Sequence, residues 1–490
     1  MEPVDLARWQ FAITTVYHFL FVPVTIGMSF VVGVTHVAWI RTRRPEWLRL
    51  TKFFGKLFTI NFALGLVTGI VQEFQFGMNW SDYSRFIGDI FGAPLALEAL
   101  LAFFVESTFL GLWIFGWGRI PEKLHAATMW VVHIGTLLSA YFILAANSFM
   151  QNPVGFRYNP QSGRAEMTDF VAILLNKVQL VAFPHIITSA YMVGGAVVMG
   201  VCVWLWRRAA RPGAPDAQDV PMYRRATRLG AVLTLVASLG VIVTGDVQGK
   251  IMTEVQPMKM AAAEALYESE TGAGFSIFTI GSLDGTEEVF AIKVPKVLAF
   301  MATGNPNGRV EGINEIKARN AEMIAGIQST YGPEVAAVAA DSDGDYTPNV
   351  PLAYWTFRLM MGLGFASMGL SVLLLWATRG PTRPPRSRLW VWAGVAAPLL
   401  PLFGNSFGWI FTETGRQPWL VNGLMTTAFG VSPSVSVAQI WTSMTVFTLL
   451  YAVLAVVEVR LFLRYVAHGA EPFHEPEQAP AQDAPLQFSY

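Results

Sequence analysis

Long apolar stretches constrain this sequence more than any other feature. The hydrocarbon core of a bilayer is about 30 Å thick, so a helix that crosses it needs about 20 apolar residues. We find about nine such stretches: 11–40, 53–76, 92–117, 124–147, 179–206, 228–245, 352–377, 389–411 and 436–462. We therefore predict an all-α integral membrane protein with about nine transmembrane helices, of which 228–245 is the shortest.

The composition agrees with a membrane protein. Hydrophobic residues make up 53% of the chain and charged residues only 14%, whereas soluble proteins carry roughly 25% charged residues. The formal net charge is zero, which gives no case for binding nucleic acid. The single cysteine, Cys202, excludes an internal disulfide or a cysteine-ligated cluster. It lies inside an apolar stretch and is interpreted as a packing residue.

Basic residues fall in alternate loops. They lie after the first, third, fifth and seventh predicted helices: Arg41, Arg43, Arg44, Arg49, Lys52, Arg119, Lys123, Arg207, Arg208, Arg211, Arg224, Arg225, Arg228, Arg379, Arg383, Arg386 and Arg388. The positive-inside rule places these loops in the cytoplasm. We predict that the N-terminus is outside and the C-terminus cytoplasmic. Acidic residues before the first stretch, and the lack of a cleavage site after it, indicate an uncleaved first helix.

We divide the chain into four parts. Transmembrane helices 1 to 6 occupy residues 1–245, and an external loop occupies residues 246–350. Transmembrane helices 7 to 9 occupy residues 351–465, and a disordered cytoplasmic tail follows at 466–490. The external loop is polar, and loops this long are usually functional or disordered. The tail is rich in proline, glutamate and glutamine, which is typical of disorder.

Ionisable residues inside a membrane helix cost roughly 2.5–3.5 kcal/mol each on insertion scales, so each one suggests a function. Four possible iron ligands lie near the outer ends of predicted helices: His18, His185, Met360 and Glu413. Haem iron accepts histidine, methionine or an anionic ligand. A His–Met pair favours electron transfer, whereas a single histidine or carboxylate leaves one position open for oxygen. Their shared depth favours haem binding.

Simpler interpretations stand beside this one. Met360 is one of 19 methionines and could be a packing residue. Glu413 and Arg416 could form an interfacial ion pair beside Trp409, since tryptophan is enriched at the membrane surface. Three other histidines are interpreted as hydrogen-bonded helix residues: His36, His125 and His133.

Two carboxylates lie on the third predicted helix. Glu98 and Glu106 are eight residues apart, which in an α-helix is roughly 12 Å along the axis and about 80° around it. Such acids typically relay protons, although hydrogen-bonded structural acids would look the same. Lys56 is close enough to the cytoplasm to extend its amine to the surface. Lys259 and Glu264, on a predicted helix of the external loop, could be ordinary solvated charges.

Several motifs resemble subunit I of the cytochrome bd quinol oxidases. The matching stretches are "QFAITTVYHFLFVP", "GKLFTINFALG", "EFQFGMNWSDYSRFIGDIFGAPLALEALLAFFVESTFLG", "ANSFMQNP", "GDVQGK", "VQPMKMAAAEA", "YTPNVPLAYWTFRLM" and "GRQPW". The resemblance runs from residue 1 to about 465. The external loop resembles the shorter of the two forms that the family uses.

The resemblance implies three haems near the outer face. His185 and Met360 match the ligands of a low-spin haem b. His18 and Glu413 match the axial ligands of a high-spin haem b and of the chlorin haem d; we favour His18 for haem d, and the reverse assignment stays open. A cyanide-insensitive relative carrying only b haems is the alternative. Further cofactor-binding residues follow from the same motifs: Arg416 toward the propionates, Trp409 between the rings, and Arg358.

The resemblance also implies where quinol and protons bind. Lys259 and Glu264 match positions for quinol binding and its proton release. Glu98 matches a carboxylate beside haem d, either on its distal side or in the proton supply. Positions matching proton delivery from the cytoplasm are Lys56, Glu106, Ser107 and Ser139. We count Glu98, Glu106, Lys259 and Glu264 as the catalytic set.

The implied activity is that of a quinol:oxygen oxidoreductase of the electrogenic, translocase class. Quinol is oxidised at the outer face, O₂ is reduced to water with cytoplasmic protons, and proton motive force arises without pumping. The expected location is the bacterial cytoplasmic (inner) membrane. The expected partners are subunit II, in a heterodimer, and small single-span subunits that can accompany it.

Two other classes of protein fit parts of the sequence. A secondary transporter usually shows internal repeats and helices broken near the midplane of the membrane. We see no repeat in this sequence, and the candidate ligands lie away from the midplane. A cytochrome b that only transfers electrons usually needs His–His pairs, and only His18 and His185 lie at suitable outer depths. Carbon monoxide binding to the reduced protein would distinguish an oxidase from such a cytochrome.

Overall fold

The computed structural model describes residues 2–282, 287–340, 343–380 and 387–474. Within these residues, nine helical segments are long and apolar enough to cross a membrane. They are α1 (Pro3–Thr42), α2 (Pro45–Met78), α3 (Ser81–Leu97) continued by η1 (Glu98–Phe103) and α4 (Phe104–Phe115), α5 (Glu122–Gln151), α7 (Lys177–Ala209), η2 (Ala217–Asp219) continued by α8 (Val220–Val255), α14 (Val350–Ala377), α15 (Leu389–Thr414) and α17 (Val437–His468). The prediction of an all-α membrane protein with about nine transmembrane helices is confirmed.

The helices extend beyond the apolar stretches that predicted them. The clearest case is α8, predicted as 228–245 and observed as Val220–Val255, a helix of 36 residues. The prediction that it is the shortest helix is therefore wrong. Hydropathy marks only the part of a helix that lies in lipid, whereas the polar ends of α8 remain helical. The expected tail lies outside the described residues from 475 on, as do Arg383 and Arg386.

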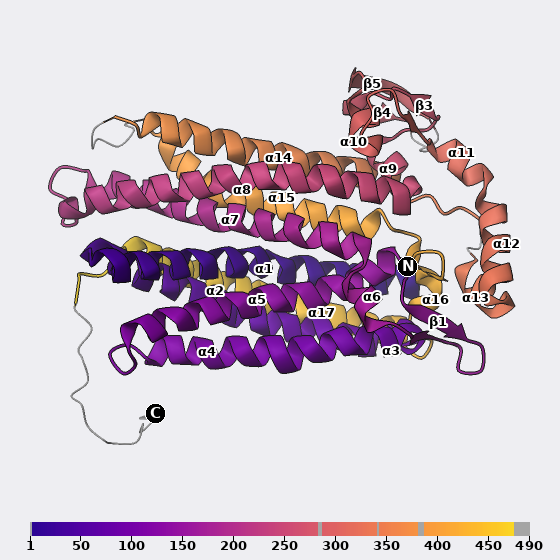
Figure 1. The fold of residues 1–490 in the computed structure, drawn as a ribbon, viewed down its shortest axis with the longest axis horizontal. Coiled ribbons are helices and arrows are strands. Elements are labelled where there is room, and N and C mark those ends of the chain that lie inside the picture. Colours follow the sequence, from indigo (N-terminus) through magenta and orange to yellow (C-terminus); the bar gives the residue numbers. More distant parts are fainter. Residues whose placement is uncertain (1, 283–286, 341–342, 381–386, 475–490) are drawn as a thin grey trace.

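The long helices run side by side, and the segment between α8 and α14 gathers at one end of them (Figure 1). We call this the loop-bearing end and the other the opposite end. Helix α1 starts at the loop-bearing end and packs against α2, α5 and α7. Helices α8 and α15 each pack against both α7 and α14. The neighbours α1 and α7 therefore join two groups of helices.

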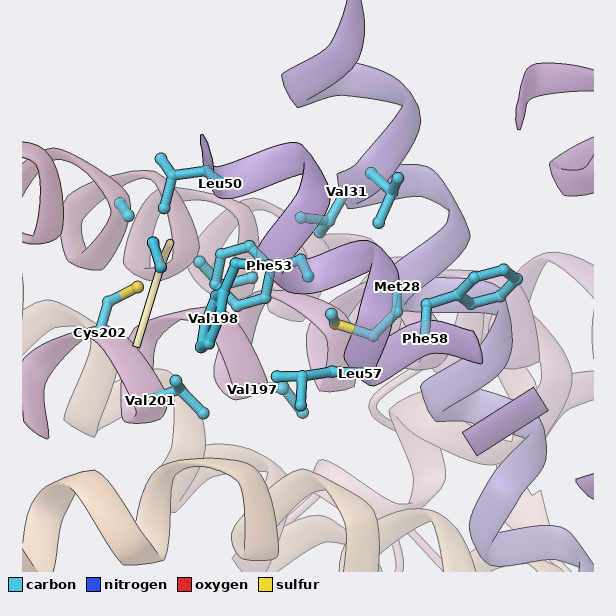
Figure 2. Close-up of a cluster of buried hydrophobic side chains, with 14 of the residues drawn as sticks. Met28, Val31, Leu50, Phe53, Leu57, Phe58, Val197, Val198, Val201 and Cys202 are labelled. Carbon is cyan, nitrogen blue, oxygen red and sulfur yellow. The ribbon is translucent and has the colours of Figure 1, made fainter. Parts of the chain in front are cut away.

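The apolar core between α1, α2 and α7 contains Met28, Phe53, Leu57, Val198 and Cys202 (Figure 2). Cys202 is fully buried there, as its predicted packing role requires. Close to this core, α1 and α7 touch backbone to backbone at Gly27 and Gly194. A Cβ added to Gly27 would lie 2.3 Å from the carbonyl oxygen of Ala190. Small residues of this kind let membrane helices approach closely.

Short elements cover the loop-bearing end. The segment between α8 and α14 contains α9 (Pro257–Glu264), β3 (Glu270–Thr271), β4 (Phe275–Gly281), β5 (Glu288–Val294), α10 (Val297–Thr303), β6 (Arg309–Val310), α11 (Ile313–Ala318), α12 (Asn320–Tyr331) and α13 (Pro333–Ala339). The other short elements come from other parts of the sequence: β1 (Phe156–Asn159), β2 (Arg164–Met167), α6 (Phe170–Leu174), β7 (Trp419–Val421), β8 (Met425–Thr426) and α16 (Thr427–Gly430). The strands of the described chain form antiparallel pairs, β1–β2, β3–β6, β4–β5 and β7–β8.

Candidate functional site

A cavity of about 480 Å³ lies between α1, α2, the α3–η1–α4 segment, α5 and α15. Its wall is mostly apolar and contains six of the predicted site residues: His18, Glu98, Glu106, Ser139, Trp409 and Glu413. Cavities of this size with a few convergent polar groups are typical of cofactor sites. The tertiary structure thus brings together side chains that are far apart in the sequence.

The imidazole of His18 is oriented by α2. Its Nδ1 lies 3.0 Å from the hydroxyl oxygen of Thr68. That hydroxyl donates to the carbonyl oxygen of Gly65, 2.9 Å away, on its own helix, so it accepts a hydrogen bond from Nδ1. The lone pair of Nε2 is then left free for a metal. A Cβ on Gly69 would lie 3.1 Å from Cε1 of His18, so the ring fills the space beside this glycine.

The imidazole of His185, on α7, is oriented by α8 in the same way. Its Nδ1 lies 3.1 Å from the hydroxyl oxygen of Thr244, which donates to the carbonyl oxygen of Gly240 at 2.8 Å. A Cβ on Gly245 would lie 3.2 Å from Cε1 of His185. Sequence reasoning missed both threonines. The signal was present, because Val-Thr-Gly occurs at 67–69 and again at 243–245.

Helix α15 separates Met360 from the cavity. A Cβ on Gly408 would lie 2.8 Å from the Met360 sulfur, so the thioether packs directly on α15. The next residue, Trp409, lines the cavity and stacks on Phe19, with ring centroids 4.9 Å apart. Met360 and His185 lie on α14 and α7, helices that both pack against α8 and α15.

Glu413 is held by two donors. Its Oε1 accepts from Asn147 Nδ2 at 2.7 Å, and its Oε2 accepts from Arg416 Nη2 at 2.6 Å. The ion pair considered from the sequence is therefore present, but its carboxylate lines the cavity. Asn147 was not anticipated.

Several buried donors near this carboxylate have no partner. Within the described residues, Nε and Nη1 of Arg416 and Nε1 of Trp409 make no hydrogen bond, and Arg416 is only 3% exposed. Buried donors are normally satisfied. Unpaired cationic and indole donors beside a cavity fit a ligand with anionic groups, such as the propionates of a haem. With the free Nε2 of His18, the residues present fit a haem.

A series of hydrogen bonds connects Glu413 to α9. Asn147 Oδ1 accepts from Gln151 Nε2 at 2.8 Å, and Gln151 Oε1 accepts from Lys259 Nζ at 3.0 Å. Lys259 Nζ also donates to the carbonyl oxygen of Thr412 at 3.0 Å. Lys259 is not a solvated loop residue, since it is 4% exposed, and burial lowers its pKa to about 7. The i, i+4 spacing of Asn147 and Gln151 in "ANSFMQNP" was the available sequence signal.

Arg358 lies against Glu264. Arg358 Nη2 donates to Glu264 Oε2 at 2.6 Å, and the Glu264 side chain is 1% exposed. Arg358 Nε also donates to the carbonyl oxygen of Ser276 at 2.6 Å. Burial raises the pKa of Glu264 to about 7, and the guanidinium opposes this shift. Arg358, predicted from the resemblance as a cofactor residue, is thus paired with the predicted quinol residue Glu264.

Glu98 and Glu106 both line the cavity, but the helix between them is not regular. Residues Glu98–Phe103 form a π-helix, so the angle of about 80°, which assumed an α-helix, is wrong. π-Turns occur frequently at functional sites. Ser139 Oγ donates to Glu98 Oε1 at 2.7 Å. Glu106 packs on α5, where a Cβ on Gly135 would lie 2.6 Å from its Cγ.

Two residues of the predicted proton route, Ser107 and Lys56, lie away from this cavity. Ser107 is exposed and donates to the carbonyl oxygen of Phe104 at 3.3 Å. Lys56 pairs with Glu471, with 2.5 Å between Nζ and Oε1, and lies on the half of α2 away from the cavity. The three histidines interpreted as helix residues do make hydrogen bonds: His36 with Trp113, His125 with Trp113, and His133 with Ser29 and Tyr191.

The fold and the site define a helical membrane protein whose buried imidazole, thioether and carboxylate groups suit haem iron. A family model described as "Cytochrome bd terminal oxidase subunit I" matches residues 6–470. The chain belongs to this family, and it is a multi-pass protein of the bacterial cytoplasmic membrane.

Curated relatives and a solved structure are similar over nearly the whole chain. Cytochrome bd ubiquinol oxidase subunit 1 of Bacillus subtilis (strain 168) is 42% identical, covering 96% of this chain and 95% of the relative. Cytochrome bd-II ubiquinol oxidase subunit 1 of Escherichia coli (strain K12) is 33% identical, covering 96% and 97%. The structure of bd oxidase from Geobacillus thermodenitrificans matches with a TM-score of 0.80 and 25% identity, covering 95% of this chain and 99% of that chain.

Proposed function

We propose that this chain is the haem-containing catalytic subunit of a terminal quinol oxidase. The observation that carries the proposal is the hydrogen-bond series from Lys259 through Gln151 and Asn147 to Glu413. It connects the predicted quinol-binding segment to the cavity with the predicted haem ligands. The names of the relatives, both ubiquinol oxidases, support quinol as the substrate.

The proposed haem ligands are those that the resemblance to the family implies. His185 and Met360 hold a low-spin haem b, Glu413 a high-spin haem b, and His18 the haem d. When bound, these groups supply the electron transfer from quinol and the reduction of oxygen. Thr68 and Thr244 keep the two imidazoles oriented with Nε2 free. Arg416 and Trp409 offer their unpaired donors to propionates. An oxidase with only b haems is the alternative.

Quinol oxidation is assigned to the loop-bearing end, which we propose faces the outside. Lys259 donates a hydrogen bond to a quinol oxygen, and Glu264 takes up a proton. A pKa near 7 suits both tasks, because each group can exchange its proton at neutral pH. Arg358 holds the Glu264 carboxylate in place from α14, the helix that also carries Met360. The segment around these residues, 246–350 in the division of the chain, is the quinol-binding part.

Protons for water formation come from the opposite, cytoplasmic end. Glu106 and the Glu98–Ser139 pair line the cavity and deliver protons into it. Lys56 and Ser107 are proposed as earlier members of this route. Because these protons cross most of the membrane, turnover moves one charge per electron and is electrogenic without a pump. Subunit II completes a heterodimer, and small single-span subunits can accompany it.

Two measurements test the proposal. The first is a reduced-minus-oxidised visible spectrum of the purified complex, repeated with carbon monoxide. A red-region chlorin band that shifts with carbon monoxide supports haem d at an open site, whereas only b-type bands that still shift support the alternative. Absence of haem absorbance from a folded complex refutes the oxidase.

The second measurement is oxygen consumption with quinol in proteoliposomes that contain a potential-sensitive dye. Quinol-dependent oxygen uptake with a membrane potential is the expected result. Oxygen uptake without any membrane potential would contradict the electrogenic mechanism while leaving the oxidase activity intact.

A further inference from the structure

The β4–β5 hairpin presents apolar side chains on its exposed face. Phe278 and Ile280 on β4 are exposed, as are Phe290 and Ile292 on β5. Phe290 is 53% exposed, a large fraction for an aromatic side chain on a water-soluble surface. Contiguous exposed apolar side chains usually mark an interaction site.

The register explains why these four side chains share one face. Phe278 pairs with Ile292 and Ile280 pairs with Phe290, and side chains two apart on a strand point the same way. Between them, Thr279 pairs with Ala291, and Thr279 is 6% exposed. Thr279 therefore faces the protein, whereas the four large apolar side chains face away. This is the reverse of the pattern expected for a hairpin surrounded by water.

The apolar face is continuous with an exposed apolar surface of α14. Phe278 contacts Trp355 edge to face, with ring centroids 5.6 Å apart. Trp355 is five residues into α14, about 8 Å from its start, and it is exposed together with Leu352 and Leu359 on the same side of that helix. Tryptophan at this depth is typical of the membrane interface. In Figure 1 the hairpin lies beside the end of α14, beyond the outline of the long helices.

The hairpin is also fastened to the proposed quinol site. The carbonyl oxygen of Ser276 on β4 accepts the hydrogen bond of Arg358 Nε, and the guanidinium lies 4.4 Å from the ring centroid of Phe275. Arg358 is the partner of Glu264. One strand thus runs from the ion pair to the apolar face.

We propose that the exposed face of the β4–β5 hairpin lies in the lipid–water interface at the loop-bearing end of the bundle. Amphipathic elements in this position bury their apolar side about 5–10 Å into the boundary between headgroups and acyl chains. If the proposed quinol oxidase function holds, the hairpin also guides membrane-borne quinol toward Glu264 and Lys259. The occupant of the face is lipid, and neither water nor a partner subunit covers it.

Depth-dependent quenching tests the lipid contact. A bimane label is attached to the cysteine of the Phe290→Cys variant in the complete complex. The labelled complex is placed in liposomes whose lipids carry a nitroxide at the headgroup or along the acyl chain. Cys202 is fully buried and should stay unlabelled, which the unsubstituted complex checks. Ser329→Cys, exposed on α12 outside the spanning helices, and Phe365→Cys, exposed on α14, are the matched aqueous and lipid controls.

The expected result is strong quenching of the label at position 290 by headgroup and shallow acyl nitroxides, and weak quenching by aqueous iodide. Iodide quenching equal to that at position 329 would place the hairpin in water and overturn the proposal. Protection from both quenchers would mean that a partner subunit covers the face, which overturns it too.

Guidance of quinol has its own readout. Replacing Phe290→Ser and Ile292→Ser together should raise the apparent KM for a long-chain quinol in liposomes roughly tenfold, with kcat and the visible spectrum unchanged. The KM for a short-chain, water-soluble quinol should stay the same. An unchanged KM for the long-chain quinol refutes guidance. If the unsubstituted complex oxidises neither quinol, the proposed function fails, whereas the quenching result still decides the lipid contact.

Discussion

The Nδ1 atom of His18 lies 3.0 Å from the hydroxyl oxygen of Thr68 on the neighbouring helix. Because that hydroxyl already donates to a carbonyl oxygen of α2, it accepts the Nδ1 proton and leaves Nε2 as the free nitrogen. A positioned imidazole with a defined tautomer binds a metal better than a mobile one. His185 and Thr244 have the same relationship, so a threonine on the neighbouring helix orients the imidazole in both helix pairs.

Thr68→Val should loosen the haem that His18 is proposed to hold. Valine has the shape of threonine but no acceptor for Nδ1, so retention of that haem should fall roughly 10- to 100-fold. Haem content per purified complex, measured by pyridine haemochrome after extended washing, checks this. Thr68→Ser keeps the hydroxyl and should retain the haem. Full haem content in the valine variant would show that Thr68 does not position the ligand.

Gly408→Ala should displace the sulfur of Met360 without unfolding the chain. The new methyl group would lie 2.8 Å from Sδ, and the end of a flexible side chain can move away, at a cost of about 1–3 kcal/mol. Part of the low-spin haem b signal should become high-spin, as seen by electron paramagnetic resonance. Gly362→Ala on α14, with no described side chain within 4 Å, is the control. An unaltered low-spin signal in Gly408→Ala would argue against Met360 as a ligand.

The rate of quinol oxidation should depend on pH with a maximum near 7. Glu264 accepts a proton only when ionised, and its pKa is raised to about 7, so kcat/KM rises with pH up to that value. Lys259, with its pKa lowered to about 7, loses its charge as pH rises further, so kcat/KM then falls. Profiles recorded in proteoliposomes between pH 5.5 and 8.5 measure both limbs, a range of roughly 1.5 units either side of the two pKa values.

Glu264→Gln isolates the rising limb of that profile. The amide cannot take up a proton, so kcat/KM should fall about 10²- to 10⁴-fold and lose its dependence on pH below 7. Glu264→Asp keeps a carboxylate and should keep the limb at a reduced rate. A rising limb that persists in the glutamine variant would assign the titration to another group.

Gly27→Ala should destabilise the bundle where α1 crosses α7. The added Cβ would lie 2.3 Å from the Ala190 carbonyl oxygen and 2.7 Å from the Gly194 nitrogen. Both contacts are with backbone, so the helices must separate, at a cost of about 3 kcal/mol or more. The thermal midpoint of the purified complex should fall. Gly369→Ala, also helical but without close neighbours, should be neutral or stabilising, and equal midpoints for the two variants would disprove the close-packing argument.

The sequence by itself determined the membrane class, the nine helices and most of the candidate ligands. The physical reason is that lipid penalises every break in apolar length and every ionisable group, so both stand out along the chain. For this reason His18, His185 and Glu413 were visible before any fold was known. Even the unforeseen threonines left a trace in the repeated Val-Thr-Gly.

Only the tertiary structure decided which of these groups meet. Apolar length predicts where a helix lies in lipid but not which helix is its neighbour. The sequence therefore did not predict that Lys259 is buried against Gln151, or that Arg358 pairs with Glu264. The π-helix that begins at Glu98 was equally hidden. Periodicity describes one helix at a time, whereas this site is made by contacts between helices.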